Sequence, residues 1–396
     1  MKAAFMNDEF FEALGRSALP LEEAETLPPQ CYTDAAFYEF EKQAVFNSEW
    51  LCVGRESHAS KPGDFFTTSI IGEPLIVARD LDGKLRAMSA VCQHRAMLVA
   101  EGHGNARGFV CPYHHWTYAL DGRLVNAPAM EKTCNFDKGQ IRLPALKTEA
   151  WLGFVFVNFD AEAGPLAPRL TAVESAVEHY DMAGAEEVGR PQTFRFNWNW
   201  KVMFENNNDG YHANRLHQGP LHDFIPSRLA TFPAVPPGSA GFLRHNRSLH
   251  PDASFNATQK AVLAIFPGLT DEDRQRLVFA NVPPTLSLVM SCDMVIYLVV
   301  RATGPETHEM DVGELVAPGA QGEPGFVHRL EMINSAAGKI MAQDQHVDEM
   351  VQVGLRSRFA VRGRYSWQEG AQIDLNRWLV PRYQSCWQSW RKGGKS

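Results

Sequence analysis

The sequence lacks both an excess of basic residues and long apolar runs. Its 38 lysines and arginines stand against 46 aspartates and glutamates, which gives a formal net charge of -8 at pH 7. Proteins that bind nucleic acid usually present a basic face, so this charge balance argues against that class. No uncharged stretch reaches the roughly 18 residues that a membrane-spanning helix needs, so we expect no membrane association either.

The start of the chain also lacks the features of a targeting segment. The stretch "MKAAFMNDEFFEALG" carries acidic residues within its apolar run and contains no cleavage-site pattern. These properties are typical neither of a signal peptide nor of a membrane anchor. We therefore expect a soluble protein of the cytoplasm.

Cysteine is scarce and odd in number. The seven cysteines, at positions 31, 52, 92, 111, 134, 292 and 386, are scattered through the chain. Such a set argues against a disulfide framework. Cys92 and Cys111 have histidines close by in the sequence, and we interpret these two as metal ligands. We expect the other five to be buried small hydrophobic residues.

The length of 396 residues exceeds what one hydrophobic core usually serves, so we expect two domains. Residues 1–45 are predicted to form a helical segment that packs on the larger domain. Residues 46–160 are predicted to form a small all-β domain, and residues 161–396 the larger domain.

Short runs of β-branched residues characterise the predicted small domain. "FFTTSII", "PLIVARD" and "LRAMSAV" have this composition, and "WLGFVFVNF" closes the segment as a strong strand. Asp82-Gly83 and Asp121-Gly122 are expected to form hairpin turns.

The larger domain combines strand and helix patterns. "RLTAVESAVEHYD" predicts a helix, "TFRFNWNWK" alternates as a strand with one packed face, and further strands are expected over 284–302 and near "HEMDVGELVA". A long helix is predicted over 325–359. Strands followed by helices indicate an α+β fold with an antiparallel sheet flanked by helices.

Two cysteines and two histidines form an interleaved pattern in "AVCQHRAMLVAEGHGNARGFVCPYHHWTY". Cys92 and His94 form a CxH pair, and after sixteen intervening residues Cys111 and His114 form a CxxH pair. Such a set could close a tetrahedral zinc site. It could also hold a [2Fe-2S] cluster, with the cysteines on one iron and the histidines on the other. The interleaving favours the cluster, because two similar loops can approach it from opposite sides.

A second pattern, DxxHxxxxH, occurs in "NWKVMFENNNDGYHANRLH". Asp209 and His212 are three residues apart and are expected to share a helical face. His217 lies five residues further on, so the helix should end or bend between the histidines. Two histidines and one carboxylate that leave open positions are the ligands of non-haem Fe(II) oxygenases.

At this point the sequence resembles the Rieske family and, within it, the alpha (terminal oxygenase) subunit of ring-hydroxylating oxygenases. "CQHR" and "CPYHHWTY" are similar to the family's cluster motif, and DxxHxxxxH is similar to its mononuclear iron motif. The family usually has glycine after both histidine motifs, where this chain has Ala96 and His115. We expect His103 and His115 to be loop residues and not ligands.

The resemblance implies a role for each motif residue. The [2Fe-2S] ligands would be Cys92, His94, Cys111 and His114. His212 and His217 would bind mononuclear Fe(II), and Asp209 would bridge the two metal centres. "AQDQHVDEMVQVGLRS" resembles the family's late helix, which implies Asp344 as the third iron ligand, with Asp348 as the alternative.

The resemblance also implies a reaction and partners. A reductase, a ferredoxin or both would supply electrons from NAD(P)H, dioxygen would be the co-substrate, and the subunits would form a head-to-tail homotrimer with or without a beta subunit. We expect hydroxylation or oxidative N- or O-dealkylation of a hydrophobic, aromatic compound in aromatic hydrocarbon catabolism. Residues suited to such a guest are Phe204, Leu216, Phe224, Phe242, Phe279, Leu288 and Met290.

Other functions remain open from the sequence. Within the family, cis-dihydroxylation of an aromatic ring and oxygenation of a quaternary amine would use the same ligands. From other classes, a Rieske electron-transfer protein would need no second iron, and a sensor would bind its ligand without consuming dioxygen.

Overall fold

The computed structural model describes residues 4–217, 221, 223 and 225–393. The chain forms two compact units, one of residues 47–165 and the other of residues 1–46 together with 166–396. The sequence-based boundaries at 46 and 160 lie within a few residues of those of the small unit. In the described ranges, no helix is long and apolar enough to span a membrane.

The small unit is an antiparallel β structure. Its main sheet has the order β1-β10-β9-β4-β3-β2-β5, and a second sheet has the order β6-β7-β8. The strands are β1 (Leu51–Arg55), β2 (Asp64–Ile70), β3 (Glu73–Arg79), β4 (Leu85–Ser89), β5 (His103–Asn105), β6 (Phe109–Val110), β7 (Thr117–Tyr118), β8 (Leu124–Asn126), β9 (Ala145–Trp151) and β10 (Phe154–Asn158).

Turn chemistry sets the hairpins of this unit. Gly83 and Gly122, the glycines of the two predicted Asp-Gly turns, have φ of 79° and 86°, in the left-handed region that glycine adopts without strain. The strand predicted in "WLGFVFVNF" is observed as β10, but it begins only at Phe154. Leu152 and Gly153 have φ of 48° and 79° and form a tight turn between β9 and β10, so the segment is part of a hairpin.

The larger unit is built on an antiparallel sheet of order β11-β18-β17-β16-β15-β14-β13, with β12 paired to β18. Its strands are β11 (Glu186–Glu187), β12 (Gln192–Phe196), β13 (Ala230–Thr231), β14 (Phe242–Arg247), β15 (Arg276–Val282), β16 (Leu286–Met290), β17 (Val295–Gly304) and β18 (Thr307–Val316). The predicted α+β class, with helices flanking an antiparallel sheet, is confirmed.

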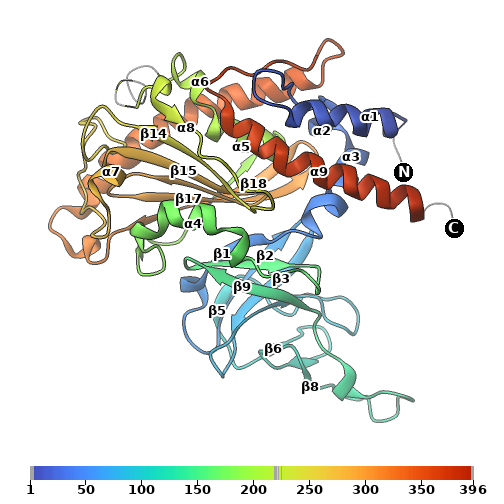
Figure 1. Ribbon diagram of the computed structural model, residues 1–396. Helices are drawn as coiled ribbons and strands as arrows, with labels where there is room; N and C mark the ends of the chain where they lie inside the picture. Colours follow the sequence, from blue (N-terminus) through green and yellow to red (C-terminus); the bar gives the residue numbers. More distant parts are fainter. Residues whose placement is uncertain (1–3, 218–220, 222, 224, 394–396) are drawn as a thin grey trace. The chain divides into compact units, whose positions relative to one another are not determined.

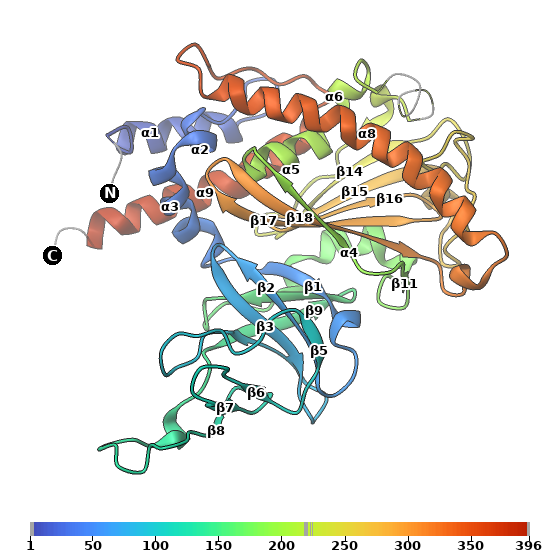
Figure 2. The ribbon, with the colours of Figure 1, turned by 180° about the vertical axis from the view of Figure 1, so that it is seen from behind.

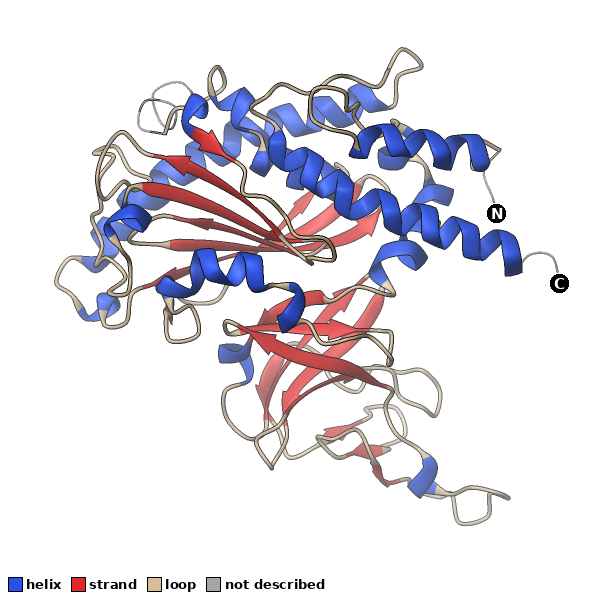
Figure 3. Cartoon of the chain, viewed as in Figure 1, coloured by secondary structure: helices blue, strands red, loops and turns tan. Residues whose placement is uncertain are grey.

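Helices cover both faces of this sheet (Figures 1, 2 and 3). Helix α8 lies on one face and α4 on the other, as the two opposite views agree. The helices of the unit are α1 (Asp8–Ala13), α2 (Gln30–Thr33), α3 (Ala35–Glu41), α4 (Thr171–Val177), α5 (Trp200–Asn208), α6 (Gly210–Ala213), α7 (Asp271–Arg274), α8 (Phe326–Leu355) and α9 (Gly370–Gly393).

The predicted strand in "TFRFNWNWK" is only half correct. Strand β12 ends at Phe196, and α5 begins at Trp200 because Asn199 caps it, accepting a hydrogen bond from the Lys201 backbone N–H. An asparagine cap and the helix that follows outweigh the apolar alternation. The chain therefore turns from the sheet into a helix just before the DxxHxxxxH motif.

A buried ion pair anchors α5 to the N-terminal segment. Lys201 Nζ lies 2.7 Å from Glu41 Oε1, and both side chains are fully buried. The Trp200 indole N–H donates to Glu41 Oε2 at 3.0 Å. Satisfied in this way, the charges fix the position of α5. The N-terminal residues thus help to position the helix that leads to the DxxHxxxxH motif.

Most of the five cysteines outside the CxH and CxxH pairs are buried, as expected. Cys31, Cys52 and Cys292 are buried, and Cys386 is half-buried. Cys134 is exposed, so for this residue the prediction of a buried hydrophobic role was wrong. It lies in the loop between β8 and β9.

Candidate metal centres and active-site cavity

Two matching loops carry the interleaved cysteines and histidines of the small unit. In the first, the Cys92 N–H donates to the Met97 carbonyl at 2.8 Å, and in the second the Cys111 N–H donates to the Trp116 carbonyl at 2.8 Å. Both cysteine side chains are buried. The loops thus have the similarity that a cluster held from two sides requires.

Ala96 and His115, which replace the family's usual glycines, occupy equivalent positions in these two loops. The N–H of Ala96 donates to the Cys92 carbonyl at 3.0 Å, and that of His115 to the Cys111 carbonyl at 2.9 Å. Ala96 and His115 have φ of 58° and 57°. Glycine adopts this left-handed conformation more readily, so both loops keep the glycine-type backbone with a larger residue.

The side chains of this set include an imidazole with a free nitrogen. The rings of His94 and His114 lie 4.6 Å apart between centroids, and His94 stacks on Trp116 at 4.8 Å. His114 Nδ1 is buried without a hydrogen-bond partner. An orphaned ring nitrogen, in a pair of loops that also carries two buried thiols, fits a bound metal group. The donor set therefore suits a [2Fe-2S] cluster.

Tyr118 supports one of the two cysteines. Its hydroxyl lies 3.3 Å from Cys92 Sγ and accepts the Gln93 backbone N–H at 3.0 Å. Burial raises the pKa of Tyr118, as does its hydrogen bond with Cys92, so the hydroxyl keeps its proton. It can donate that proton to a thiolate at Cys92.

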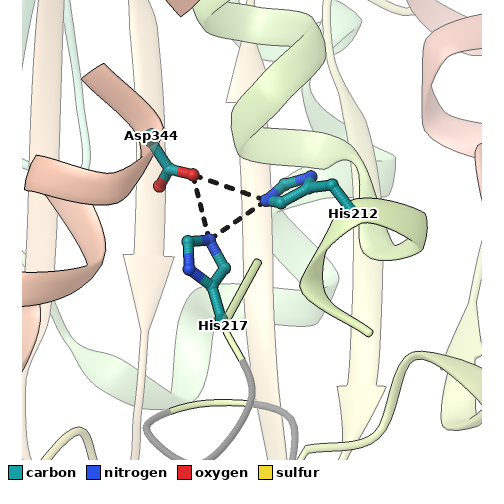
Figure 4. A group of neighbouring side chains, drawn as sticks. All are labelled: His212, His217 and Asp344. Atoms are coloured by element: carbon teal, nitrogen blue, oxygen red, sulfur yellow. Dashed lines mark hydrogen bonds and ion pairs between the residues drawn. The ribbon is translucent and has the colours of Figure 1, made fainter. Parts of the chain in front are cut away.

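The second ligand set converges in the larger unit, as Figure 4 shows. His212 Nε2 lies 3.1 Å from His217 Nε2. Asp344 Oδ1 lies 3.5 Å from His212 Nε2 and 2.9 Å from His217 Nε2. Ligands bound at about 2.1 Å and at right angles would be about 3.0 Å apart. The three atoms are thus spaced as neighbouring ligands of one ion.

The carboxylate oxygen in this group behaves as a ligand atom would. Asp344 Oδ1 is buried and receives no hydrogen bond, although both ring nitrogens are close to it. A buried acceptor left without a proton donor is costly unless a cation satisfies it. The geometry and the donor types therefore fit a divalent metal ion.

A break in the helix positions His212. The expectation that Asp209 and His212 share a helical face was wrong, because Asp209 has an extended backbone between α5 and α6. Its carboxylate caps α6 by accepting the Tyr211 N–H at 2.5 Å. Helix α6 ends at Ala213, and the turn after it brings His217 back toward His212.

Two acceptors orient the imidazoles. Asp209 Oδ2 lies 3.0 Å from His212 Nδ1, and Gln343 Oε1 lies 2.9 Å from His217 Nδ1. Each acceptor holds a proton on Nδ1 and leaves Nε2 to face the other ligands. Sequence reasoning missed Gln343. Its position next to Asp344 on the same helix was the available signal.

Asp348, the alternative ligand, lies elsewhere in the cavity wall. The converging group contains His212, His217 and Asp344. Asp348 is buried one helical turn after Asp344. Burial, together with the nearby charge of Asp344, raises the pKa of Asp348 to about 8, although a hydrogen bond with Asn206 acts in the opposite direction.

An apolar cavity of about 170 Å³ adjoins the three ligands. Of the described residues expected to contact the substrate, Phe279 lines it, whereas Phe204, Phe242, Leu288 and Met290 are buried core residues. Leu216 is half-buried and does not line the cavity. Phe224 lies outside the described residues. The alternation of "TFRFNWNWK" could have identified the missed lining residues Phe196 and Trp198.

Comparisons with known proteins agree with this architecture. Residues 49–145 match the family model of the Rieske [2Fe-2S] domain, and residues 176–385 match that of the ring hydroxylating alpha subunit (catalytic domain). The carnitine monooxygenase oxygenase subunit of Escherichia coli (strain K12) is 35% identical over 204 residues, which cover 50% of this chain and 54% of that protein. The chloroplastic choline monooxygenase of Arabidopsis thaliana is 33% identical over 220 residues, covering 51% and 50%. The chain thus spans about half the length of the curated relatives it matches.

Solved structures share the fold. The quaternary ammonium Rieske monooxygenase CntA in complex with γ-butyrobetaine has a TM-score of 0.77 at 22% identity, covering 93% of this chain and 98% of that one. Naphthalene 1,2-dioxygenase from Rhodococcus sp. has a TM-score of 0.81 at 18% identity, covering 96% and 99%. Because the match to the catalytic-domain model spans more than half of the 396 residues, the chain belongs to the ring-hydroxylating alpha subunit family and carries a Rieske [2Fe-2S] domain before its catalytic domain.

Proposed function

We propose that the chain is the terminal oxygenase component of a multicomponent Rieske oxygenase. It would use dioxygen to oxygenate a small organic molecule held in the cavity of the larger unit. The observation that carries this proposal is the convergence of His212, His217 and Asp344 at the wall of an apolar cavity. An electron-transfer protein has no need of such a ligand set.

In this proposal Cys92, His94, Cys111 and His114 hold the [2Fe-2S] cluster, and the converging group holds a mononuclear iron. Ferrous iron with two imidazoles and one carboxylate supplies open coordination positions for dioxygen chemistry. Asp209 and Gln343 keep the imidazole protons on Nδ1. A substrate that fills the largely apolar cavity would displace water from the site.

Electrons would come from NAD(P)H through a reductase, a ferredoxin or both. We propose a head-to-tail homotrimer in which the cluster of one subunit serves the mononuclear site of the next, with Asp209 as the bridge. Electron transfer between subunits is described for a quaternary ammonium Rieske monooxygenase whose solved structure has a similar fold. This similarity supports the same route here. Asp209 already bonds a proposed ligand, His212, through one oxygen.

For the substrate, we propose a quaternary amine as the first candidate. The relatives are described as monooxygenases of carnitine, glycine betaine and choline. Aromatic side chains, among them Trp198, line the cavity, and their ring faces favour an organic cation. Oxygenation at a carbon beside the nitrogen would cleave a C–N bond.

An aromatic hydrocarbon is the second candidate. Phe196, Phe255 and Phe279 give the cavity a largely apolar lining that suits a flat hydrophobic guest. The reaction would then be hydroxylation or cis-dihydroxylation of the ring or, for an aromatic ether, O-dealkylation.

The test is a single turnover of prereduced, iron-loaded protein with labelled dioxygen. The substrates would be γ-butyrobetaine, L-carnitine, choline, naphthalene and indole, with product and oxygen uptake followed together. We expect labelled product from one substrate class and none from Asp344→Ala, in which the cluster is kept. Cluster oxidation without product, for every substrate and equally in both proteins, would instead indicate an electron-transfer protein.

A further inference from the structure

A buried arginine without hydrogen-bond partners lines the active-site cavity. Arg244 lies on β14 and is only 4% exposed. Its Nε and Nη1 atoms are buried and make no hydrogen bond with any residue that the structure describes. Buried guanidinium groups are normally paired with carboxylates or carbonyl oxygens, so these atoms lack the acceptors they require.

The surrounding residues hold the guanidinium beside the metal-binding segment. The central guanidinium carbon, Cζ of Arg244, lies 3.7 Å from the centre of the ring of Phe279. Phe279 is the residue paired with Arg244 on the neighbouring strand β15. The guanidinium also lies close to Gly210: a methyl group in place of the Gly210 side-chain hydrogen would be 3.6 Å from Arg244 Nη1. Gly210 begins α6, two residues before His212. The positive charge is therefore fixed at the end of the cavity where α6 begins.

Asp209 is the carboxylate whose charge acts on Arg244, but it is engaged elsewhere. Its Oδ1 accepts the Tyr211 N–H, and its Oδ2 lies 3.0 Å from His212 Nδ1. Among the residues that the structure describes, no carboxylate forms an ion pair with Arg244. Burial lowers the pKa of Arg244 to about 10, and Asp209 opposes this change, so the side chain remains a cation at neutral pH.

We propose that Arg244 is a specificity-determining residue that binds a carboxylate group of the substrate. The inference rests on the proposed function, because it assumes that the cavity holds the substrate. A guanidinium offers a planar pair of N–H donors that fits a carboxylate, and the low polarity around it strengthens the bond. Phe279 fixes the plane of the donors before the ligand arrives. Such a contact would orient the remainder of the substrate along the apolar lining.

Two kinds of substrate could supply the carboxylate that Arg244 would bind. A betaine carries a carboxylate together with a quaternary ammonium group, whereas an aromatic acid carries a carboxylate on an apolar ring. The probes are therefore γ-butyrobetaine with its methyl ester, and 4-methylbenzoate with its methyl ester. Each pair differs in the charge that Arg244 would bind.

Binding is measured by calorimetry on the iron-loaded full chain under argon, without reductant. We expect the wild-type protein to bind at least one acid ten or more times more tightly than its ester. In Arg244→Met this preference should disappear while binding of the ester changes little. In Arg244→Lys, which keeps the charge but not the planar donors, an intermediate preference is expected.

Arg247→Met is the matched control, because Arg247 lies on the same strand with an exposed side chain on the opposite face. Its preference for the acid should equal that of the wild type. If Arg244 acts only through its charge on Asp209, Arg244→Met would lower the affinities for the acid and for the ester equally. That result would overturn the proposal. Equal binding of acid and ester by the wild-type protein, for both pairs, would also overturn it, even where Arg244→Met does not fold.

Failure of the proposed function gives a different result. Because the titrations need neither dioxygen nor electrons, a chain that never forms product can still prefer an acid to its ester. A chain that forms product from uncharged substrates and shows no such preference would retain the proposed function and lose this inference.

Discussion

Gln343 Oε1 accepts a hydrogen bond from His217 Nδ1 at 2.9 Å, and Gln343 directly precedes Asp344 on α8. One helix thus supplies both a carboxylate of the converging group and the acceptor that orients a histidine of the same group. Because an amide oxygen can only accept, the Nδ1 atom must carry the ring proton. The Nε2 lone pair is then free for a metal ion.

This relationship predicts a loss of metal affinity in Gln343→Leu. Removal of an acceptor behind a metal-bound histidine typically weakens metal binding by about 10- to 100-fold. Competition with a chelator, followed by iron analysis, measures the change. Gln345→Leu is the control, because the Gln345 side chain bonds Glu349 on the same helix. Equal iron affinities for the two variants would contradict the prediction.

The choice between the two acidic residues of α8 gives a second prediction. We expect Asp344→Ala to lose the exchangeable iron and to keep the visible absorption of the cluster, because Asp344 Oδ1 faces both imidazoles. Asp348→Ala should keep the iron, since Asp348 lies outside the converging group. The iron content of each variant after gel filtration distinguishes the two assignments. Loss of iron from Asp348→Ala alone would show that the ligand assignment is wrong.

A third prediction concerns Asp209, whose two oxygens have different partners. In Asp209→Asn, the remaining oxygen can still cap α6, whereas the amide nitrogen would face the N–H of His212. We expect the fold and the cluster to be retained, about 10- to 100-fold weaker iron binding, and much slower electron transfer at saturating iron.

Rapid mixing of the prereduced Asp209→Asn protein with substrate and dioxygen tests the electron route. Cluster oxidation at the wild-type rate, with iron fully loaded, would show that Asp209 only orients His212. Asp209→Ala is less informative, because it removes the helix cap together with the bridge, and a lost cap costs about 1 kcal/mol.

Tyr118 provides a prediction that does not depend on turnover. A hydrogen bond to a cluster sulfur stabilises the reduced, more negative state. The Tyr118 hydroxyl lies 3.3 Å from Cys92 Sγ, so Tyr118→Phe should lower the reduction potential. A bond worth about 0.5–1.5 kcal/mol corresponds to roughly 20–60 mV for one electron. A potentiometric titration monitored by EPR measures it, and an unchanged potential would exclude the bond.

The candidate ligands could be proposed from the sequence because their motifs are local. The interleaved CxH and CxxH pairs define two loops, and the backbone of each loop is set by its own hydrogen bonds. The long helix predicted over 325–359 is observed as α8 (Phe326–Leu355), because its pattern extends over many turns.

Two local helix caps were missed, and features that depend on tertiary contacts could not be predicted. The capping roles of Asn199 and Asp209 override the apolar and helical patterns in which they lie. Arg244 is far in sequence from both motifs, and only the pairing of β14 with β15 places it over Phe279. A sequence pattern identifies a chemical group, but the sheet decides which groups meet in the cavity.

The last prediction concerns the pH dependence of stability and a residue far from both metal centres in sequence. Asp374 on α9 has a side chain that is only 10% exposed, with Arg377 Nη1 at 3.8 Å. Burial raises the pKa of Asp374 from its ordinary 3.8 to about 6, and Arg377 offsets this only in part. Between these two pKa values the folded state binds more protons than the unfolded state. The free energy of unfolding must therefore fall as the pH rises through this window.

Asp374→Asn removes this titration. The contribution of Asp374 to stability is fully present below about pH 4 and is lost as the pH rises through about 6, by up to about 3 kcal/mol at 1.36 kcal/mol per pKa unit. We expect the variant to gain stability relative to the wild-type protein between pH 4.5 and 7.5, measured as paired urea midpoints. In Arg377→Met, the opposing charge is absent, so the loss should extend to higher pH than in the wild type. A difference between wild type and Asp374→Asn that stays constant over this range would mean that burial does not perturb the carboxyl of Asp374.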